Sequence, residues 1–196
     1  MKKELIPYLG QGLQKYDKSD IRAQDPKNTI EVFQNEIWPK VEKYIPSESR
    51  ILDVGCGNGR YSSFLSRHCS EVVAIDAFRD INPKHESENI RFVRTTFQEF
   101  PEQGFDVVFM FGVFFLQESW DTYESFKLVM DKLNPGGVFV TIDEAWRDDR
   151  RMLSKHSEHG RYNIGELCVR NQSRVLEDFV QANGVHRVTV VRNKTW

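Results

Sequence analysis

The sequence predicts an α/β fold in which helices cover both faces of a doubly wound, mostly parallel sheet. Short and almost wholly apolar runs alternate along the chain with amphipathic helical patterns, as in parallel strands joined by crossover helices. The first such run, RILDVG, leads directly into a glycine-rich turn at residues 55–59 and then into a helical pattern. At 196 residues with 39% hydrophobic content, the chain is long enough for one sizeable core, so we expect a single domain.

The expected elements follow this alternation. Residues 28–45 carry apolar side chains at helical spacing, and Pro39 is expected to kink or restart that helix. The first strand is expected at 50–55 and the first crossover helix at 61–68. Further strands are expected at 71–78, 90–97, 105–115 and 138–143, with a helix at 121–133.

The C-terminal residues are expected to form one helix and one strand. Residues 171–184 have apolar side chains at helical spacing and end in a glycine, and residues 185–191 alternate as a strand does. Because only five residues follow, the C-terminal antiparallel edge of the sheet is expected to be shortened, unless GELCVR at 165–170 is a strand.

Composition argues against several classes of partner. The 27 Lys and Arg residues against 29 Asp and Glu residues leave a net charge of -2, which gives no overall positive field for nucleic acid or anionic lipid. No apolar run is long enough for a membrane span or a signal peptide, so we expect a soluble, cytoplasmic protein. Cys56, Cys69 and Cys168 show no metal-ligand spacing, and we expect no metal site.

The turn after the first strand is expected to bind a ligand. Gly55, Gly57 and Gly59 lie at alternate positions after Asp53, although each glycine costs about 0.5–1 kcal/mol relative to alanine inside regular structure. Glycine allows positive φ and lets a ligand lie directly against the backbone. The spacing G-x-G-x-G differs from the dinucleotide fingerprint G-x-G-x-x-G, so a different cofactor is indicated.

The stretch LDVGCGNG closely resembles the D/E-x-G-x-G-x-G motif of class I S-adenosylmethionine-dependent methyltransferases. The segments VVAIDAF, FDVVFMFGVFF and LNPGGVFV resemble the family's second strand, its fourth strand and the segment before its fifth strand. The resemblance covers roughly residues 29–143. It implies a Rossmann-like sheet, S-adenosylmethionine as cofactor, S-adenosylhomocysteine as product, and methyl transfer by in-line displacement.

The resemblance also implies cofactor contacts at the carboxyl ends of the first four strands. Asp76 is expected to accept hydrogen bonds from the ribose hydroxyls, and Asp53 is expected near the methionine amine. The acid that many members carry after the third strand is absent, and Thr96 and Phe97 stand there to meet the adenine edge and face. The expected cofactor-binding residues are Asp53, Gly55, Cys56, Gly57, Asn58, Gly59, Asp76, Ala77, Phe78, Thr96, Phe97, Met110, Phe111 and Gly112.

Some of these positions have a structural alternative. Phe97, Met110 and Phe111 fit equally well as plain core residues of the sheet, and Asp53 as a turn-forming side chain. The sequence alone leaves both interpretations open.

Catalytic residues are less well defined, because the methyl donor is already activated and no strong acid or base is required. Candidates for removing a proton from the acceptor follow the fifth strand. They are Asp143, Glu144, His156, His159 and Tyr162. The chain is expected to divide into an N-terminal cap (1–28), a cofactor core (29–143), an acceptor-side lid (144–172) and a C-terminal helix and strand (173–196).

A small-molecule acceptor is favoured over nucleic acid. The fourth strand ends in MFGVFF, whereas enzymes that methylate nucleic-acid amines usually carry a D/N/S-P-P-F/Y turn there. Methyl transfer to protein or RNA, aminopropyl transfer, and a non-catalytic S-adenosylmethionine-binding module remain as alternatives.

Overall fold

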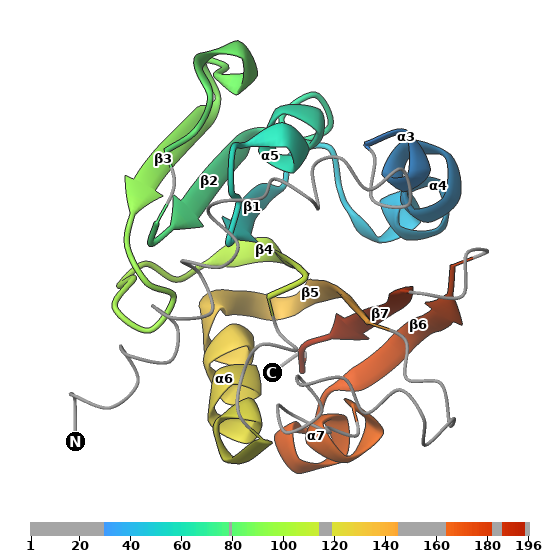
Figure 1. The fold of residues 1–196 in the computed structure, drawn as a ribbon. Helices are drawn as coiled ribbons and strands as arrows, with labels where there is room; N and C mark the ends of the chain where they lie inside the picture. Colours follow the sequence, from blue (N-terminus) through green and yellow to red (C-terminus); the bar gives the residue numbers. More distant parts are fainter. Residues whose placement is uncertain (1–29, 79, 114–118, 145–163, 182–185, 195–196) are drawn as a thin grey trace, which may run out of the picture.

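The structure is a computed structural model that describes residues 30–78, 80–113, 119–144, 164–181 and 186–194 (Figure 1). A seven-stranded sheet has the strand order β3-β2-β1-β4-β5-β7-β6. The strands are β1 (Arg50–Val54), β2 (Glu71–Asp76), β3 (Ile90–Arg94), β4 (Phe105–Phe111), β5 (Leu133–Glu144), β6 (Arg174–Val180) and β7 (His186–Arg192). The helical elements are α3 (Ile30–Val32), η2 (Phe33–Ile37), α4 (Trp38–Val41), η3 (Glu42–Tyr44), α5 (Arg60–Leu65), η4 (Pro83–His85), α6 (Ser119–Lys132) and α7 (Ile164–Asn171).

The sheet is parallel from β3 to β5, which confirms the predicted fold class. β1 is the middle strand of this parallel part and pairs with both β2 and β4. From β1 the chain runs outward to β2 and β3 on one side, and it then returns to continue through β4 and β5 on the other. Strand order therefore reverses between β1 and β4, and the carboxyl ends of these strands border the crevice in which such sheets bind ligands.

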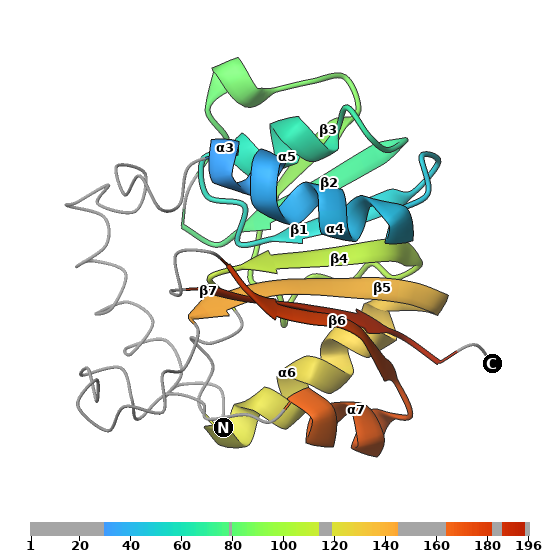
Figure 2. The same cartoon turned by 90° about the vertical axis from the view of Figure 1, so that its right-hand side faces the viewer.

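Helices cover both faces of the sheet (Figure 2). On one face α3, α4 and α5 pack against strand residues such as Ile51 and Val72, and on the other face α6 and α7 pack against Leu52 and Val73. Neighbouring residues of β1 and β2 thus enter opposite cores, because successive strand side chains point to opposite faces. The near-continuous apolar runs in the sequence reflect this two-sided burial.

The N-terminal helical segment restarts next to Pro39, as predicted. Residues 30–44 are helical throughout, but 33–37 form a π-helical turn in which the Trp38 N–H donates to the Phe33 carbonyl. Pro39 lies in the first turn of α4, where its missing N–H is tolerated. The predicted apolar face is also present, because Phe33, Ile37 and Val41 are buried.

The prediction for the C-terminal edge is wrong. Residues 174–180, expected as a helix, form strand β6, and α7 covers the GELCVR segment instead. β7 pairs antiparallel with both β5 and β6, so the antiparallel edge is complete rather than shortened. The register of β6 shifts between Val175 and Glu177, which makes Leu176 an extra residue in the strand. Such a bulge interrupts the two-residue alternation of side chains and gave the segment the appearance of helical spacing.

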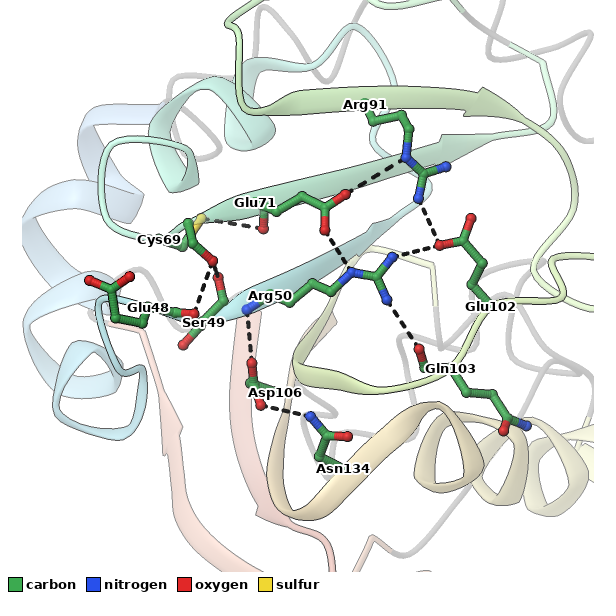
Figure 3. Close-up of polar contacts among 11 residues, drawn as sticks. Glu48, Ser49, Arg50, Cys69, Glu71, Arg91, Glu102, Gln103, Asp106 and Asn134 are labelled. Atoms are coloured by element: carbon green, nitrogen blue, oxygen red, sulfur yellow. Dashed lines mark hydrogen bonds and ion pairs between the residues drawn. The ribbon is translucent and has the colours of Figure 1, made fainter.

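A network of charged side chains joins the amino ends of the strands, opposite the ligand-binding edge (Figure 3). The Arg50 guanidinium at the start of β1 donates to Glu71 of β2 and to Glu102 of the loop before β4, each at 2.6 Å. Arg91 of β3 also contacts both carboxylates, and these two arginines lower the pKa of Glu102. The Arg50 N–H donates to Asp106 at 2.9 Å. Because these side chains are partly exposed, each pair contributes modestly, but together they fix the relative positions of the first four strands.

Candidate functional site

The turn between β1 and α5 lies at the carboxyl edge of the sheet. Gly55, Gly57 and Gly59 have φ angles of 69°, 58° and 85°, all in the left-handed region. Residues with a Cβ adopt this region only at a cost, so each of the three positions favours glycine for its backbone conformation alone. The Gly55 and Cys56 N–H groups donate to the Ile75 carbonyl of β2 at 2.8 and 3.1 Å, which attaches the turn to the neighbouring strand.

Only the middle glycine faces open space. A Cβ on Gly55 would lie 2.4 Å from Cγ2 of Val113, and a Cβ on Gly59 would lie 2.2 Å from Cγ1 of Ile81. A Cβ on Gly57 would meet nothing within 4 Å. The surface of bare backbone is therefore narrower than the sequence suggested and is centred on Gly57.

Asp76, the last residue of β2, points its carboxylate at this turn. Its Oδ2 accepts the Gly57 N–H at 3.0 Å, and its Oδ1 accepts the Phe78 N–H at 2.8 Å. These two bonds fix the orientation of the Asp76 carboxylate next to the turn. Asp76 thus lies beside the open backbone at Gly57, as its expected role requires.

Asp53 lies at the carboxyl end of β1 and is almost fully buried, with 1% of its surface exposed. The Ser62 hydroxyl of α5 donates to Oδ2 of Asp53 at 2.6 Å. Burial raises the pKa of Asp53 to about 6, and the charge of Asp76 adds to this, whereas the Ser62 hydrogen bond lowers it. Two carboxylates at neighbouring strand ends make the edge a favourable place for a cationic ligand group.

The remaining residues of the turn hold its shape. The Asn58 side chain accepts the Arg60 N–H at 3.3 Å, and the Asn58 carbonyl accepts the Asn82 N–H at 2.9 Å. Cys56 is buried, and burial together with the charges of Asp53 and Asp76 raises the pKa of its thiol. Cys56 is therefore a protonated, unreactive packing residue.

Ala77 and Phe78 follow β2 directly, in the part of the site where adenine is expected. The Phe78 side chain is 51% exposed. The Thr96 hydroxyl accepts the Glu99 N–H at 3.2 Å and donates to the Glu99 carboxylate at 3.0 Å, so it caps a turn. Phe97 packs in the core on the α6 side of the sheet. The structure thus gives Thr96 and Phe97 structural positions, and their contacts with adenine stay predictions.

The residues after β4 and β5 are only partly described. Met110 is a core residue, and Phe111 packs against Tyr61 with ring centroids 4.6 Å apart. Gly112 has a φ of 65°, and its N–H donates to the Ile142 carbonyl at 2.8 Å. Backbone pairing places Asp143 and Glu144 at the carboxyl end of β5. His156, His159 and Tyr162 lie outside the described residues.

Sequence reasoning missed three residues that shape the turn, namely Ser62, Ile81 and Val113. Ser62 left a signal, because it is a polar residue two positions before the buried Phe64 in a short helix. Ile81 and Val113 left none, since their contacts depend on how separate loops fold back onto the turn.

Within the described ranges, no group of three or more His, Cys, Asp or Glu residues is arranged to hold a metal ion. No described helix is both long enough and apolar enough to cross a membrane.

Comparisons with known proteins identify a methyltransferase domain in this chain. Residues 51–137 match the family model of a methyltransferase domain. Over 114 residues the chain is 31% identical to a tRNA U34 carboxymethyltransferase of Pseudomonas fluorescens, a match that covers 53% of this chain and 35% of that protein. The chain therefore spans well under two thirds of that relative's length.

Solved structures share the fold. The N-methyltransferase NodS of Bradyrhizobium japonicum WM9, in complex with S-adenosylhomocysteine, aligns with a TM-score of 0.70 at 20% identity over 93% of this chain and 97% of that one. The 1,6-didemethyltoxoflavin-N1-methyltransferase of Burkholderia thailandensis aligns with a TM-score of 0.72 at 16% identity over 99% and 91% of the two chains. At these identities the likeness establishes the common architecture.

Proposed function

We propose that the protein is a class I S-adenosylmethionine-dependent methyltransferase, which transfers a methyl group from S-adenosylmethionine to a small-molecule acceptor; residues 51–137 match the family model of a methyltransferase domain. The observation that carries the proposal is the position of Asp76, whose carboxylate accepts the N–H of Gly57 at 3.0 Å. Gly57 is also the glycine of the turn that faces open space.

The residues present fit such a cofactor. The Asp76 carboxylate, held beside the open backbone at Gly57, is of a type that accepts hydrogen bonds from ribose hydroxyls, and Asp53 provides a buried carboxylate for the ammonium group of the methionine part. The exposed ring of Phe78 is available to pack on the base. When bound, the cofactor supplies a methyl group on a positive sulfur, which is already a good leaving group. The chain's own contribution is to hold the reactants close and aligned, which reduces the entropic part of the barrier.

A small-molecule acceptor is favoured by the net charge of -2 and by the Burkholderia neighbour, which is named for a small heterocyclic substrate. Transfer to RNA is the second candidate, because the Pseudomonas relative is named for a tRNA nucleotide. That name also specifies a carboxymethyl rather than a methyl group. We further propose that the protein works in the cytoplasm. Of the acceptor-side lid expected at 144–172, residues 164–171 instead form α7, which packs in the core on the α6 side of the sheet. Residues 145–163 and the expected cap at 1–28 lie outside the described residues.

The experiment is transfer of label from [methyl-³H]S-adenosylmethionine to acceptors in two separate fractions, a small-metabolite extract and unmodified total tRNA. Label in the metabolite fraction, reduced with the Asp76→Ala variant when the cofactor is below saturation, would support the proposal. Label only in tRNA would show that the acceptor is RNA rather than a small molecule, while the assignment of the cofactor would stand. Binding of S-adenosylhomocysteine without transfer to either fraction would favour a non-catalytic module.

A further inference from the structure

The hydrogen bond between Ser62 and Asp53 lies beneath the glycine turn. Ser62 is fully buried on α5, and Asp53 is 1% exposed at the end of β1. Their oxygen atoms are 2.6 Å apart, within the range of a hydroxyl donating to an ionised carboxylate. Because β1 enters the turn and α5 leaves it, this bond connects the two ends of residues 55–59.

The other groups around Asp53 disfavour its charge. Burial has the largest effect, and Asp76 of β2 adds repulsion. Burial raises the pKa values of the neighbouring Cys56 thiol and Tyr61 phenol, and the charge of Asp53 raises them further, so neither group brings a compensating positive charge. Of the three influences on the pKa of Asp53, the Ser62 hydrogen bond is the one that favours the ionised form.

We propose that Ser62 is a positioning residue of the cofactor site, whose hydroxyl fixes the Asp53 carboxylate for pairing with the ammonium group of the ligand. This rests on the proposed function, because it assumes a ligand with an ammonium group at the turn. A buried carboxylate without its hydrogen-bond donor takes up a proton more readily, and a neutral carboxyl pairs weakly with a cation. Ser62 therefore acts on the ligand through Asp53 and need not touch it.

The test is the pH dependence of S-adenosylhomocysteine binding, measured by calorimetry between pH 5 and pH 7.5. In this range the ligand's amino group stays mostly protonated, so changes in affinity report the protein. Affinity of the native protein should fall as pH drops through about 6, where Asp53 titrates. If Ser62→Ala raises the Asp53 pKa by about one unit, binding weakens by about ninefold at pH 5 and by less than twofold at pH 7.5.

Two further variants separate the hydroxyl from the shape of the side chain. Threonine and valine have nearly the same shape, so Ser62→Thr and Ser62→Val add the same bulk at this buried position, but only threonine keeps a hydroxyl donor. The threonine variant should bind more tightly than the valine variant, by a ratio that grows as pH falls. Ser63→Ala, one residue further along α5, is the matched control and should keep the native pH profile.

Two results would overturn the inference while leaving the proposed function intact. One is a loss of affinity in Ser62→Ala that is the same at every pH, which is the signature of a purely structural role. The other is identical pH profiles for the threonine and valine variants. Failure of the native protein itself to bind S-adenosylhomocysteine would instead contradict the proposed function.

Discussion

At Asp76, two backbone N–H groups from different loops converge on one carboxylate, those of Gly57 and Phe78. The turn thereby holds the carboxylate beside open backbone before any ligand arrives. Such preorganisation reduces the ordering that binding would otherwise require.

Replacing Asp76 by alanine should weaken S-adenosylhomocysteine binding by about 1–3 kcal/mol, roughly 5- to 150-fold, because charge-assisted hydrogen bonds to the ribose are lost. Asp76→Asn keeps the shape and one acceptor, so it should fall between alanine and the native protein. Calorimetry gives the affinities, and urea unfolding shows whether the turn itself is weakened. An unchanged affinity in both variants would remove Asp76 from the site.

Asp53 should make the ligand-free protein less stable as pH rises. Its pKa is raised from 3.8 to about 6, so the folded state holds a proton that the unfolded state has released. The resulting stabilisation is complete below pH 3.8 and is lost as pH rises through about 6, with an upper size of about 3 kcal/mol. Urea unfolding between pH 5 and pH 7.5 measures the change.

The control is Asp53→Asn, which keeps the shape and an acceptor for the Ser62 hydroxyl but does not titrate. His85 acts in the opposite direction, because its lowered pKa makes the folded state bind fewer protons near pH 6. The difference between the two proteins therefore isolates Asp53. If the difference in unfolding free energy between the native protein and Asp53→Asn does not change with pH, the pKa of Asp53 is not raised by folding.

For individual residues, the sequence predicted which ones border the turn but not which contacts each one makes. Asp76 follows from its distance to the glycines and lies where that distance placed it. The three glycines were expected to serve one ligand, yet Gly55 and Gly59 are packed against Val113 and Ile81. Contacts of that kind come from loops distant in sequence, which local patterns do not encode.

At the scale of elements, one buried side chain joins the end of α6 to the last strand. Asn193, just after β7, donates from Nδ2 to the carbonyls of Met130, Leu133 and Asn134 at 3.0, 3.4 and 3.4 Å. The last carbonyls of a helix have no partner within the helix, so a remote amide caps this one. The contact also fixes the start of β5, which carries the LNPGG segment.

Asn193→Ala should lower the free energy of unfolding by about 1–3 kcal/mol, because buried carbonyls lose their donor. Asn193→Asp should cost more, since it places carboxylate oxygens against those carbonyls. Urea denaturation measures both, and alanine at the exposed neighbour Lys194 is the control. Equal stability of the aspartate variant and the native protein would show that the amide does not act as the cap.

Element types were predictable wherever burial on both faces gave uniform apolar runs, as in β1, β2 and β4. The error at β6 has a local cause. This strand lies at the sheet edge, where its side chains are only half-buried, and Leu176 breaks the alternation. Its apolar residues then fall at spacings that also suit a helix, and pairing with β7 decides the outcome.

At the scale of the whole molecule, the sheet separates two hydrophobic cores and leaves the site at one edge. The α3, α4 and α5 side supports the turn through Phe64 and Leu65, and the α6 side supports the ends of β1 and β2 through Val54 and Ile75. The charged network of Arg50 secures the opposite edge. Fold class and cofactor edge were predictable because they follow from strand order and the glycine turn, whereas the acceptor depends on segments without a local pattern.

The most direct measurement is a crystal structure of the protein with S-adenosylhomocysteine. The ribose hydroxyls should lie within hydrogen-bond distance of the Asp76 carboxylate, with the amino-acid part against Gly57 and its ammonium group facing Asp53. Density for the ligand elsewhere, or an Asp76 carboxylate turned away from the sugar, would contradict the account.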